Sequence, residues 1–535
     1  MGLTSRQTMG FAALLMGGSV FLSRFMGLIR DKVISWQFGA GADTDVYFAA
    51  FVVPDFINYL LAGGYVSMTL IPLLSASFER DEEDGWRFFS CVICWNSIAA
   101  GVLVLLGWVF APQLARLTMP GFDEAQLARL TLYLRIILPG QLFFLAGSCL
   151  TALLYIRKSF AVPALTPLIY NGCIIVGGVA WPFFTGTYFE ADMTGYAVGA
   201  SLGALFGAFA LPLYAATRSE SGGVRFRAML RHPLLWRYVR LALPLMVGQS
   251  VVVLDEQLVR VFGSMVGEGV VSQLNYARRI MLVPVGVVAQ AAGVASFPFL
   301  TALAASGDRA AFTETMSSAI SKGLFVMLPI AAWMIAAAEP VLGLIFEGGR
   351  FGAEDTRASA LLLQVLLLSL PFWLVQQIVG RCFYAWQDTV TPAVLGTLVT
   401  VLALPVYWVV TGRFGAMGVA VVSAGSIACY AVVLAARWVH CFGTAAFRGL
   451  ASPLFRCALF SGLAGAASWA AERALRDVMP FDALNAFFEM FVFSLSGFLA
   501  GMMQHALCLA VSLAVFVAVY ALLALLFLRR GLNIR

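Results

Sequence analysis

Long apolar segments recur along the chain from Met9 almost to Leu528, and short stretches rich in charge, glycine or proline separate them. An apolar run of roughly 20 residues forms a helix that can cross a bilayer, whereas a membrane-spanning barrel needs alternating segments of about ten. The pattern therefore predicts an all-α polytopic membrane protein with about fourteen transmembrane helices. The expected spans are residues 9–35, 45–76, 88–112, 130–156, 161–184, 194–216, 238–262, 271–302, 316–338, 358–385, 390–411, 415–436, 455–472 and 505–528.

Composition supports the membrane assignment. Hydrophobic residues make up 61% of the 535 residues and charged residues only 12%, whereas soluble proteins carry about 25% charged residues. These values exclude a soluble enzyme, a nucleic-acid binder and a disordered scaffold. Residues 481–501 are apolar around Glu489, which fits either an interfacial helix or part of a longer final hairpin. The first apolar segment lacks an evident cleavage site, so we expect a retained helix rather than a signal peptide.

An internal repeat emerges when the chain is compared with itself at an offset of about 230 residues. The segment from Tyr155 to Pro163 matches that from Tyr384 to Pro392, and Arg30 falls on Arg260. Six spans per repeat give both halves the same orientation, related by an axis along the membrane normal. We therefore expect an N-terminal lobe, a cytoplasmic linker, a C-terminal lobe and two additional helices. Their expected bounds are residues 1–217, 218–237, 238–440 and 441–535.

Arginines determine the expected orientation. The connection from Arg218 to Arg240 holds six of them, and positive charge is enriched in cytoplasmic loops. Because this loop follows the sixth span, both termini are expected in the cytoplasm.

Arg24 and Arg30 are the most informative residues. One interpretation ends the first helix near Leu22 and leaves both arginines in an extracellular loop, where basic residues are disfavoured. The other continues the helix, so that Arg30 lies roughly 9 Å beyond Arg24 inside the membrane. Intramembrane arginine is costly and should face a water-filled cavity or a partner. Asp31 shares a helix face with Arg24 and could hold it.

A second charged cluster surrounds the seventh and eighth spans. Asp255 and Arg260 lie late in the seventh span, where they are either functional or a structural ion pair within one helix end. Arg278 and Arg279 enter the eighth span, and only one of them can face a cavity because adjacent helical residues point about 100° apart. Asp255 and Asp388 are candidates for cation binding, with helix-end structural roles as the alternative.

Several of these segments carry a family resemblance. The stretch SRFMGLIRDKVISWQFGAGADTDVYFAAFVVP, from Ser23 to Pro54, resembles the N-terminal signature of the MurJ/MviN family of lipid II flippases. Three further motifs resemble that family in the same order. They are NYARRIMLVPVGV (275–287), IFEGGRFGAEDT (345–356) and RCFYAWQDTVTP (381–392).

This resemblance implies an inner-membrane protein of the multidrug/oligosaccharidyl-lipid/polysaccharide exporter superfamily, with a cationic cavity between two lobes. The implied substrate is the undecaprenyl-pyrophosphate-linked peptidoglycan precursor, lipid II, and cell-wall synthesis proteins are possible partners. Residues implied to bind it are Arg24, Arg30, Arg279 and Asp45. The resemblance implies no catalytic residue, cofactor or metal.

Three positions depart from the family pattern. Arg278 stands where Asp is usual, and Asn58 and Gly63 stand where an Arg and an Ala-Glu-Gly are common. These departures put the substrate's glycan in doubt.

Binding a pyrophosphate agrees with the residue chemistry, because arginine stays charged and grips phosphate oxygens with a planar fork. Two other functions remain open: a flippase for another lipid-linked oligosaccharide, of O-antigen or teichoic type, and a polytopic enzyme acting on a lipid pyrophosphate. The enzyme is disfavoured because the three histidines are dispersed and the loops are short. No Walker motif is present, so the expected energy source is an ion gradient or the membrane potential.

Overall fold

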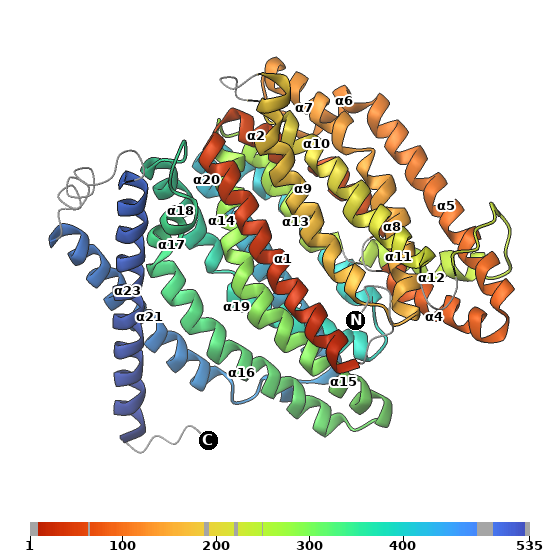
Figure 1. Ribbon diagram of the computed structural model, residues 1–535. Coiled ribbons are helices and arrows are strands. Elements are labelled where there is room, and N and C mark those ends of the chain that lie inside the picture. Colours follow the sequence, from red (N-terminus) through yellow and green to blue (C-terminus); the bar gives the residue numbers. More distant parts are fainter. Residues whose placement is uncertain are drawn as a thin grey trace. The chain divides into compact units, whose positions relative to one another are not determined.

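The computed structural model describes residues 9–62, 65–186, 192–218, 223–248, 250–478 and 496–529. Helices make up most of these ranges, and the only β feature within them is an isolated bridge between Gly348 and Phe351 (Figure 1). The predicted all-α fold is therefore confirmed. Most of residues 481–501, for which an interfacial helix was one interpretation, lie outside the described ranges.

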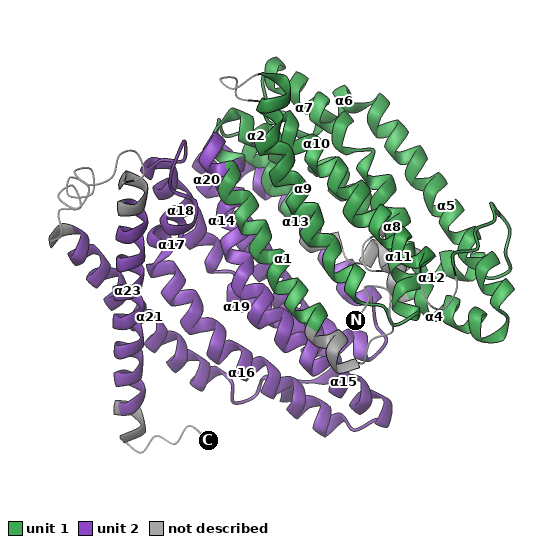
Figure 2. Cartoon of the chain, in the orientation of Figure 1, with its two compact units in different colours: residues 1–34, 41–271 green, residues 35–40, 272–535 purple. Residues whose placement is uncertain are grey.

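The chain divides into two compact units (Figure 2). Unit 1 comprises the described residues up to 34 and residues 41–271, and unit 2 comprises residues 35–40 and those from 272 onward. This division by packing differs from the expected lobes, because the helices of residues 235–264 pack on the helices of residues 42–80. The expected lobes are defined by symmetry instead, so their boundaries stay a prediction.

Unit 1 is built from membrane helices and shorter segments. In chain order they are α1 (Met9–Phe38, whose last turn belongs to unit 2), α2 (Ala42–Ala49), α3 (Val52–Ala62), α4 (Tyr65–Arg80), α5 (Glu82–Val109), α6 (Ala111–Thr118), α7 (Glu124–Ile137), α8 (Gly140–Ile156), α9 (Ala161–Thr185), α10 (Thr194–Gly203), the π-helix η1 (Ala204–Ala210), α11 (Leu211–Thr217), α12 (Leu235–Gly248) and α13 (Ser250–Ser264).

Unit 2 holds the remaining elements. They are α14 (Val270–Pro284, whose first two residues belong to unit 1), the π-helix η2 (Val285–Gln290), α15 (Ala291–Ser306), α16 (Arg309–Ala336), α17 (Ala338–Phe346), α18 (Ala353–Leu367), α19 (Leu370–Ala385), α20 (Val390–Phe442), the 3₁₀ turn η3 (Ala445–Phe447), α21 (Ala451–Val478) and α23 (Ser496–Arg529).

Several expected spans are interrupted rather than continuous. Residues 45–76 fall into α2, α3 and α4, and residues 358–385 fall into α18 and α19, which are bent by 42°. Residues 130–156 instead lie within one continuous span, Glu124–Ile156, in which α7 meets α8 at Leu138 and Pro139 because proline cannot donate a backbone hydrogen bond. By length and hydropathy, nine helices of the described chain could cross a membrane, or ten if the bent pair is one span. The count of fourteen stays a prediction.

The segment α20 contains two of the expected spans. Gly415 has a left-handed φ of 57° and interrupts the helical backbone. The chain then folds back on itself, as two contacts show. A Cβ on Gly418 would lie 2.5 Å from the carbonyl oxygen of Val410, and the Tyr430 hydroxyl donates to Pro392 O at 3.1 Å. The two antiparallel helices correspond to the expected spans 390–411 and 415–436.

Local geometry supports the internal repeat. Lys158, between α8 and α9, and Gln387, between α19 and α20, have φ values of 58° and 61°, and they are the only non-glycine residues with positive φ in the described ranges. Each donates its backbone N–H over 3.0 Å, to Tyr155 O and Tyr384 O respectively. The 28-residue helices α5 and α16 also correspond, each with an aspartate N-cap that accepts backbone N–H bonds.

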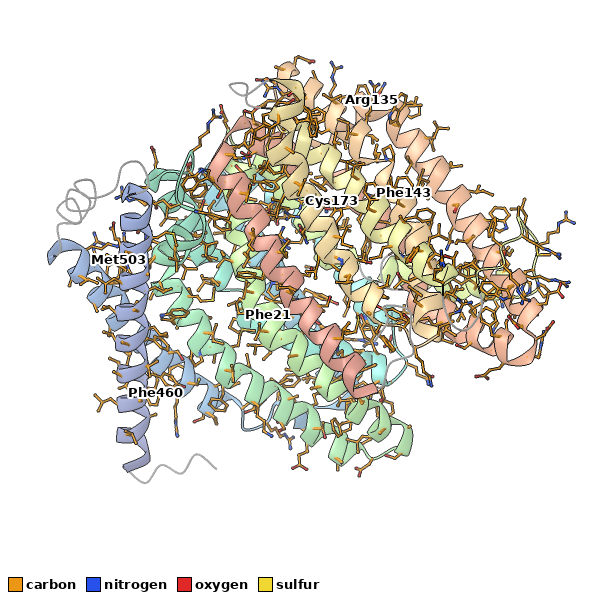
Figure 3. The ribbon with its side chains drawn as sticks, viewed as in Figure 1. Phe21, Arg135, Phe143, Cys173, Phe460 and Met503 are labelled. Carbon is orange, nitrogen blue, oxygen red and sulfur yellow. The ribbon has the colours of Figure 1, made fainter. Side chains whose placement is uncertain are left out.

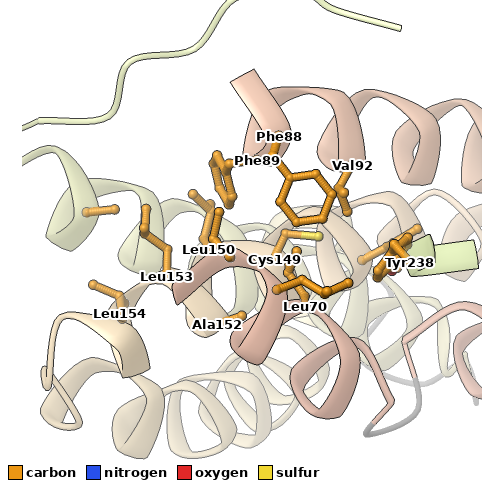
Figure 4. Close-up of a cluster of buried hydrophobic side chains, with 14 of the residues drawn as sticks. Leu70, Phe88, Phe89, Val92, Cys149, Leu150, Ala152, Leu153, Leu154 and Tyr238 are labelled. Carbon is orange, nitrogen blue, oxygen red and sulfur yellow. The ribbon is translucent and has the colours of Figure 1, made fainter. Parts of the chain in front are cut away.

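A hydrophobic cluster lies at the centre of unit 1 (Figure 4). It joins Leu70 of α4 and Phe88 and Phe89 of α5 to Leu150 and Leu153 of α8, all at most 2% exposed. The outside of the helices also carries apolar side chains, including Phe21 on α1, which is 73% exposed (Figure 3). An apolar exterior around an apolar interior is the arrangement expected of a protein solvated by lipid.

Candidate functional site

The helix α1 carries both Arg24 and Arg30. It runs without a break from Met9 to Phe38, so neither arginine lies in a flanking loop. Arg24 is exposed on this helix, whereas the side chain of Arg30 is only 14% exposed. The structure thus favours the interpretation that the first helix continues through both residues, and their position inside the membrane stays a prediction.

Arg30 is fixed in position by neighbours within unit 1. Its Nη2 and Nε donate to Oδ1 of Asp31 at 2.8 and 2.9 Å, and its Nη1 donates to Oδ1 of Asn171 on α9 at 3.2 Å. Asn171 in turn donates from Nδ2 to Pro167 O at 2.9 Å, which orients its carbonyl oxygen toward the arginine. Asp31 therefore holds Arg30, while its expected contact with Arg24 stays a prediction.

Tyrosines surround this ion pair. Tyr47 and Tyr170 lie close enough to Arg30 to interact with it electrostatically. Tyr47 packs edge-on against Tyr196 with ring centroids 5.9 Å apart. Tyr47 is 1% exposed, and its hydroxyl has no hydrogen-bond partner among the described residues. A buried hydroxyl without a partner is costly, so Tyr47 provides a polar atom available to a ligand beside Arg30. Sequence reasoning did not identify Tyr47 or Asn171.

A second ion-pair cluster joins α13 to α3. Arg260 donates from Nη2 to Glu256 at 2.8 Å and from Nη1 to both Asp55 and Gln257 at 3.2 Å. The side chain of Arg260 is 10% exposed, and those of Asp55 and Glu256 are 41% and 39% exposed. Asp55 was missed from the sequence, although it directly follows Pro54, the last residue of the segment that resembles the family signature. Asp255 is itself buried at 3% exposure.

These two clusters have a defined charge balance. Arg30 faces Asp31, and Arg260 faces Asp55 and Glu256. The charge of Arg30 also acts on Asp55. Both arginines therefore already have carboxylate partners. An anionic ligand would have to compete with these carboxylates, so its binding requires some of the ion pairs to open.

Asp45 is held by the protein itself. It lies on α2 at 1% exposure, and its Oδ2 accepts a hydrogen bond from the backbone N–H of Gly269 at 2.7 Å. Gly269 has a φ of 83°, a conformation that glycine adopts readily. Asp45 thus fixes the loop between α13 and α14.

The neighbouring arginines of α14 have different environments within unit 2. Arg278 is 5% exposed and donates from Nη1 to the Ser423 hydroxyl at 3.3 Å. Arg279 is half-buried. Arg279 is thus the more exposed of the two, and its role in binding stays a prediction.

The other singled-out positions are less informative. Asp388 accepts from the backbone N–H of Thr391 at 2.9 Å and so caps the start of α20, which favours a structural role. Asn58 is half-buried on α3, and Gly63 lies outside the described residues.

Comparisons with known proteins identify the family. The family model described as lipid II flippase MurJ matches residues 34–489. A protein from Bdellovibrio bacteriovorus named probable lipid II flippase MurJ is 27% identical over 390 residues, covering 72% of this chain and 73% of the relative. One from Rhizobium meliloti with the same name is 26% identical over 446 residues, covering 81% and 80%.

Solved structures agree on the fold. A lipid II flippase MurJ in an inward closed conformation aligns with a TM-score of 0.76 and 21% identity over 97% of this chain and 100% of that one. An inward-facing multidrug transporter of the MATE family and MOP superfamily gives a TM-score of 0.64 at 16% identity, covering 80% and 96%. With the family model spanning most of the sequence, this multi-pass membrane protein belongs to the MurJ family.

Proposed function

We propose that this protein is a flippase that moves lipid II, the undecaprenyl-pyrophosphate-linked peptidoglycan precursor, across the bacterial inner membrane. The observation that carries the proposal is the unbroken helix α1, which holds both Arg24 and Arg30. Relatives that cover most of the chain are named probable lipid II flippases, which supports this substrate.

The proposed mechanism is alternating access without covalent chemistry. Arg24, Arg30 and Arg279 bind the pyrophosphate, and Asp45 supports the site by holding the loop at Gly269. Guanidinium groups suit this task because they stay charged and bind phosphate oxygens in bidentate fashion. The headgroup crosses inside the protein while the prenyl tail stays in lipid, along the two C-terminal helices α21 and α23.

Binding is coupled to local rearrangement. Because Arg30 is paired with Asp31, the incoming pyrophosphate exchanges with a carboxylate instead of filling a ready cationic cavity. An exchange of one ion pair for another costs less than separating two buried charges, so the substrate can drive it. An ion gradient or the membrane potential supplies the energy, with Asp255 and Asp388 as candidate cation ligands and both termini in the cytoplasm.

Complementation tests the proposal. The gene is expressed in a strain depleted of its own lipid II flippase, and growth is followed together with membrane expression. Rescue is the expected result. Failure at normal membrane expression would contradict lipid II as the substrate and indicate a flippase for another lipid-linked glycan, a possibility raised by the departures at Arg278 and Asn58.

A further inference from the structure

An exposed lysine lies on helix α16, six residues after the start of the expected span 316–338. Lys322 is one of only three lysines in the chain, and α16 is 28 residues long with an apolar composition. At 1.5 Å per residue, Lys322 lies roughly 20 Å from the start of this helix. Among the described residues it forms no hydrogen bond or ion pair, although a charged group within a membrane span is costly and marks a functional site by default.

Lys322 lines a pocket between α15 and α16 in unit 2. The pocket has a volume of about 480 Å³. Its α15 wall includes Ala295, Ser296 and Phe299, and its α16 wall includes Ser318 one turn before Lys322. Helical side chains lean toward the N-terminus of their helix, so the ammonium of Lys322 extends toward the level of Ser318.

The hydrogen-bonding groups of the pocket define what it can bind. The hydroxyls of Ser296 and Thr315 already donate to the backbone carbonyls of Gly293 and Ala311, at 3.1 and 2.8 Å. Ser318 and Lys322 therefore remain as donors, on one face of the helix and without an acceptor among the described residues. Two adjacent donors, one of them cationic, match the oxygens of a phosphate ester.

Two other charged groups influence the pocket. Glu314 also lines the pocket, with its Cα about 12 Å from that of Lys322 along the helix axis, and its carboxylate opposes the attraction of the ammonium for an anion. Behind α15, Arg381 of α19 has a buried Nη1 with no hydrogen-bond partner in the described part of the chain. This Nη1 occupies the space that a Cβ on Gly293 would need, one turn before Ser296. Its positive charge adds to the attraction for an anion.

The internal repeat shows that the fold does not require this lysine. The helices α5 and α16 have the same length and the same aspartate cap, so Lys322 corresponds to Trp95 of α5. Trp95 is 44% exposed, as is usual for an aromatic residue on a lipid-facing helix. A cation at this position is thus specific to one half of the molecule.

We propose that the pocket between α15 and α16 binds the phosphate headgroup of a lipid, with Lys322 and Ser318 as its donors. Phe299 and Ala295 provide the apolar wall for the adjoining chain. The lipid is either the prenyl pyrophosphate that the protein transports or a phospholipid of the surrounding membrane. Both share the phosphate ester chemistry, and the inference does not depend on which glycan is moved.

Lipid binding to the purified full-length protein tests this inference, with farnesyl pyrophosphate and phosphatidylglycerol as probes. Lys322→Gln removes the charge, and Ala295→Leu fills the pocket without changing charge. Each is expected to weaken binding of at least one probe about tenfold, the scale of one charged hydrogen bond. The matched controls Lys322→Arg and Ala302→Leu, the latter exposed on α15 outside the pocket, should retain binding.

The two probes distinguish the two lipids that could occupy the pocket, the transported prenyl pyrophosphate and a membrane phospholipid. Weakened binding of farnesyl pyrophosphate alone assigns the pocket to the transported lipid, and weakened binding of phosphatidylglycerol assigns it to a membrane lipid. Unchanged affinity for both probes in Lys322→Gln and Ala295→Leu would overturn the inference. Because binding is measured directly, this result is independent of whether the protein rescues a flippase-depleted strain.

Discussion

The charged residues of α1, α3 and α13 are arranged as partners rather than as isolated cations. Arg30 contacts Asp31 and Asn171, and Arg260 contacts Asp55 and Glu256. The arginines could be recognised in the sequence because charge inside an apolar segment is conspicuous. Asp55 and Asn171 could not, because they lie 205 and 141 residues from the arginines that they contact.

Replacing the arginines proposed to bind the pyrophosphate tests the site at the scale of single residues. We expect Arg24→Ala, Arg30→Ala and Arg279→Ala each to reduce translocation at least about tenfold, since each removes charged hydrogen bonds to phosphate. The corresponding lysine variants should recover part of the activity, because lysine restores the charge without the planar fork. The measurement is lipid II translocation at matched membrane expression. Full activity of Arg24→Ala combined with Arg279→Ala would exclude the site.

At the scale of elements, close backbone contact holds α9 against α10. A Cβ on Gly177 would lie 2.6 Å from the carbonyl oxygen of Gly195, so the two helices approach where they lack side chains. Small residues permit this contact in membranes, where dispersion forces between helices replace the hydrophobic effect.

Gly177→Ala should therefore push α9 and α10 apart and lower the free energy of unfolding by about 1–3 kcal/mol. Gly172→Ala on the same helix is the matched control, because nothing lies within 4 Å of a Cβ at that position. Thermal unfolding of the two variants in one detergent gives the comparison. Equal melting temperatures would contradict the close-contact explanation.

The C-terminal helix α23 is attached to the loop after α17 by a hydrogen bond between His505 and Glu347. Nε2 of His505 lies 3.2 Å from Oε2 of Glu347, whose carboxylate also accepts from the Thr356 hydroxyl at 2.7 Å. Partial burial acts to raise the pKa of Glu347, but the hydrogen bonds from His505 and Thr356 and the charges of His505 and Arg476 outweigh it and lower that pKa.

A lowered carboxyl pKa stabilises the folded protein above the unfolded value, about 4.3, and this contribution is lost as the pH falls through the folded value. We expect acidification below about pH 4.3 to lower the melting temperature, with a contribution of about 1 kcal/mol from Glu347. Glu347→Gln should have lower stability at pH 7 and a smaller loss on acidification. An identical pH profile in both proteins would refute the attachment through this carboxylate.

At the scale of the whole molecule, the distribution of arginine determines the predicted orientation. The segment that joins α11 to α12 carries Arg225, Arg227 and Arg231, all exposed, and such a loop is retained on the cytoplasmic side.

Cysteine labelling tests this topology after replacement of the exposed Cys429 and Cys441. A cysteine introduced at Arg225 should resist an impermeant reagent added to intact cells. One introduced at Thr185, the last residue of α9, should react with it. The positive-inside rule predicts this difference because arginine-rich loops are not translocated. Labelling at position 225 in intact cells would reverse the orientation.

The sequence by itself determined the helical fold, because apolar runs of membrane length leave the backbone no other way to satisfy its hydrogen bonds in lipid. It also located the matching segments 155–163 and 384–392, in which the structure shows turns with positive φ at Lys158 and Gln387. Tertiary structure decided where spans are interrupted and which carboxylates hold Arg30 and Arg260. It also decided that α12 and α13 pack in unit 1. These features depend on contacts between distant residues, and local hydropathy carries no information about such partners.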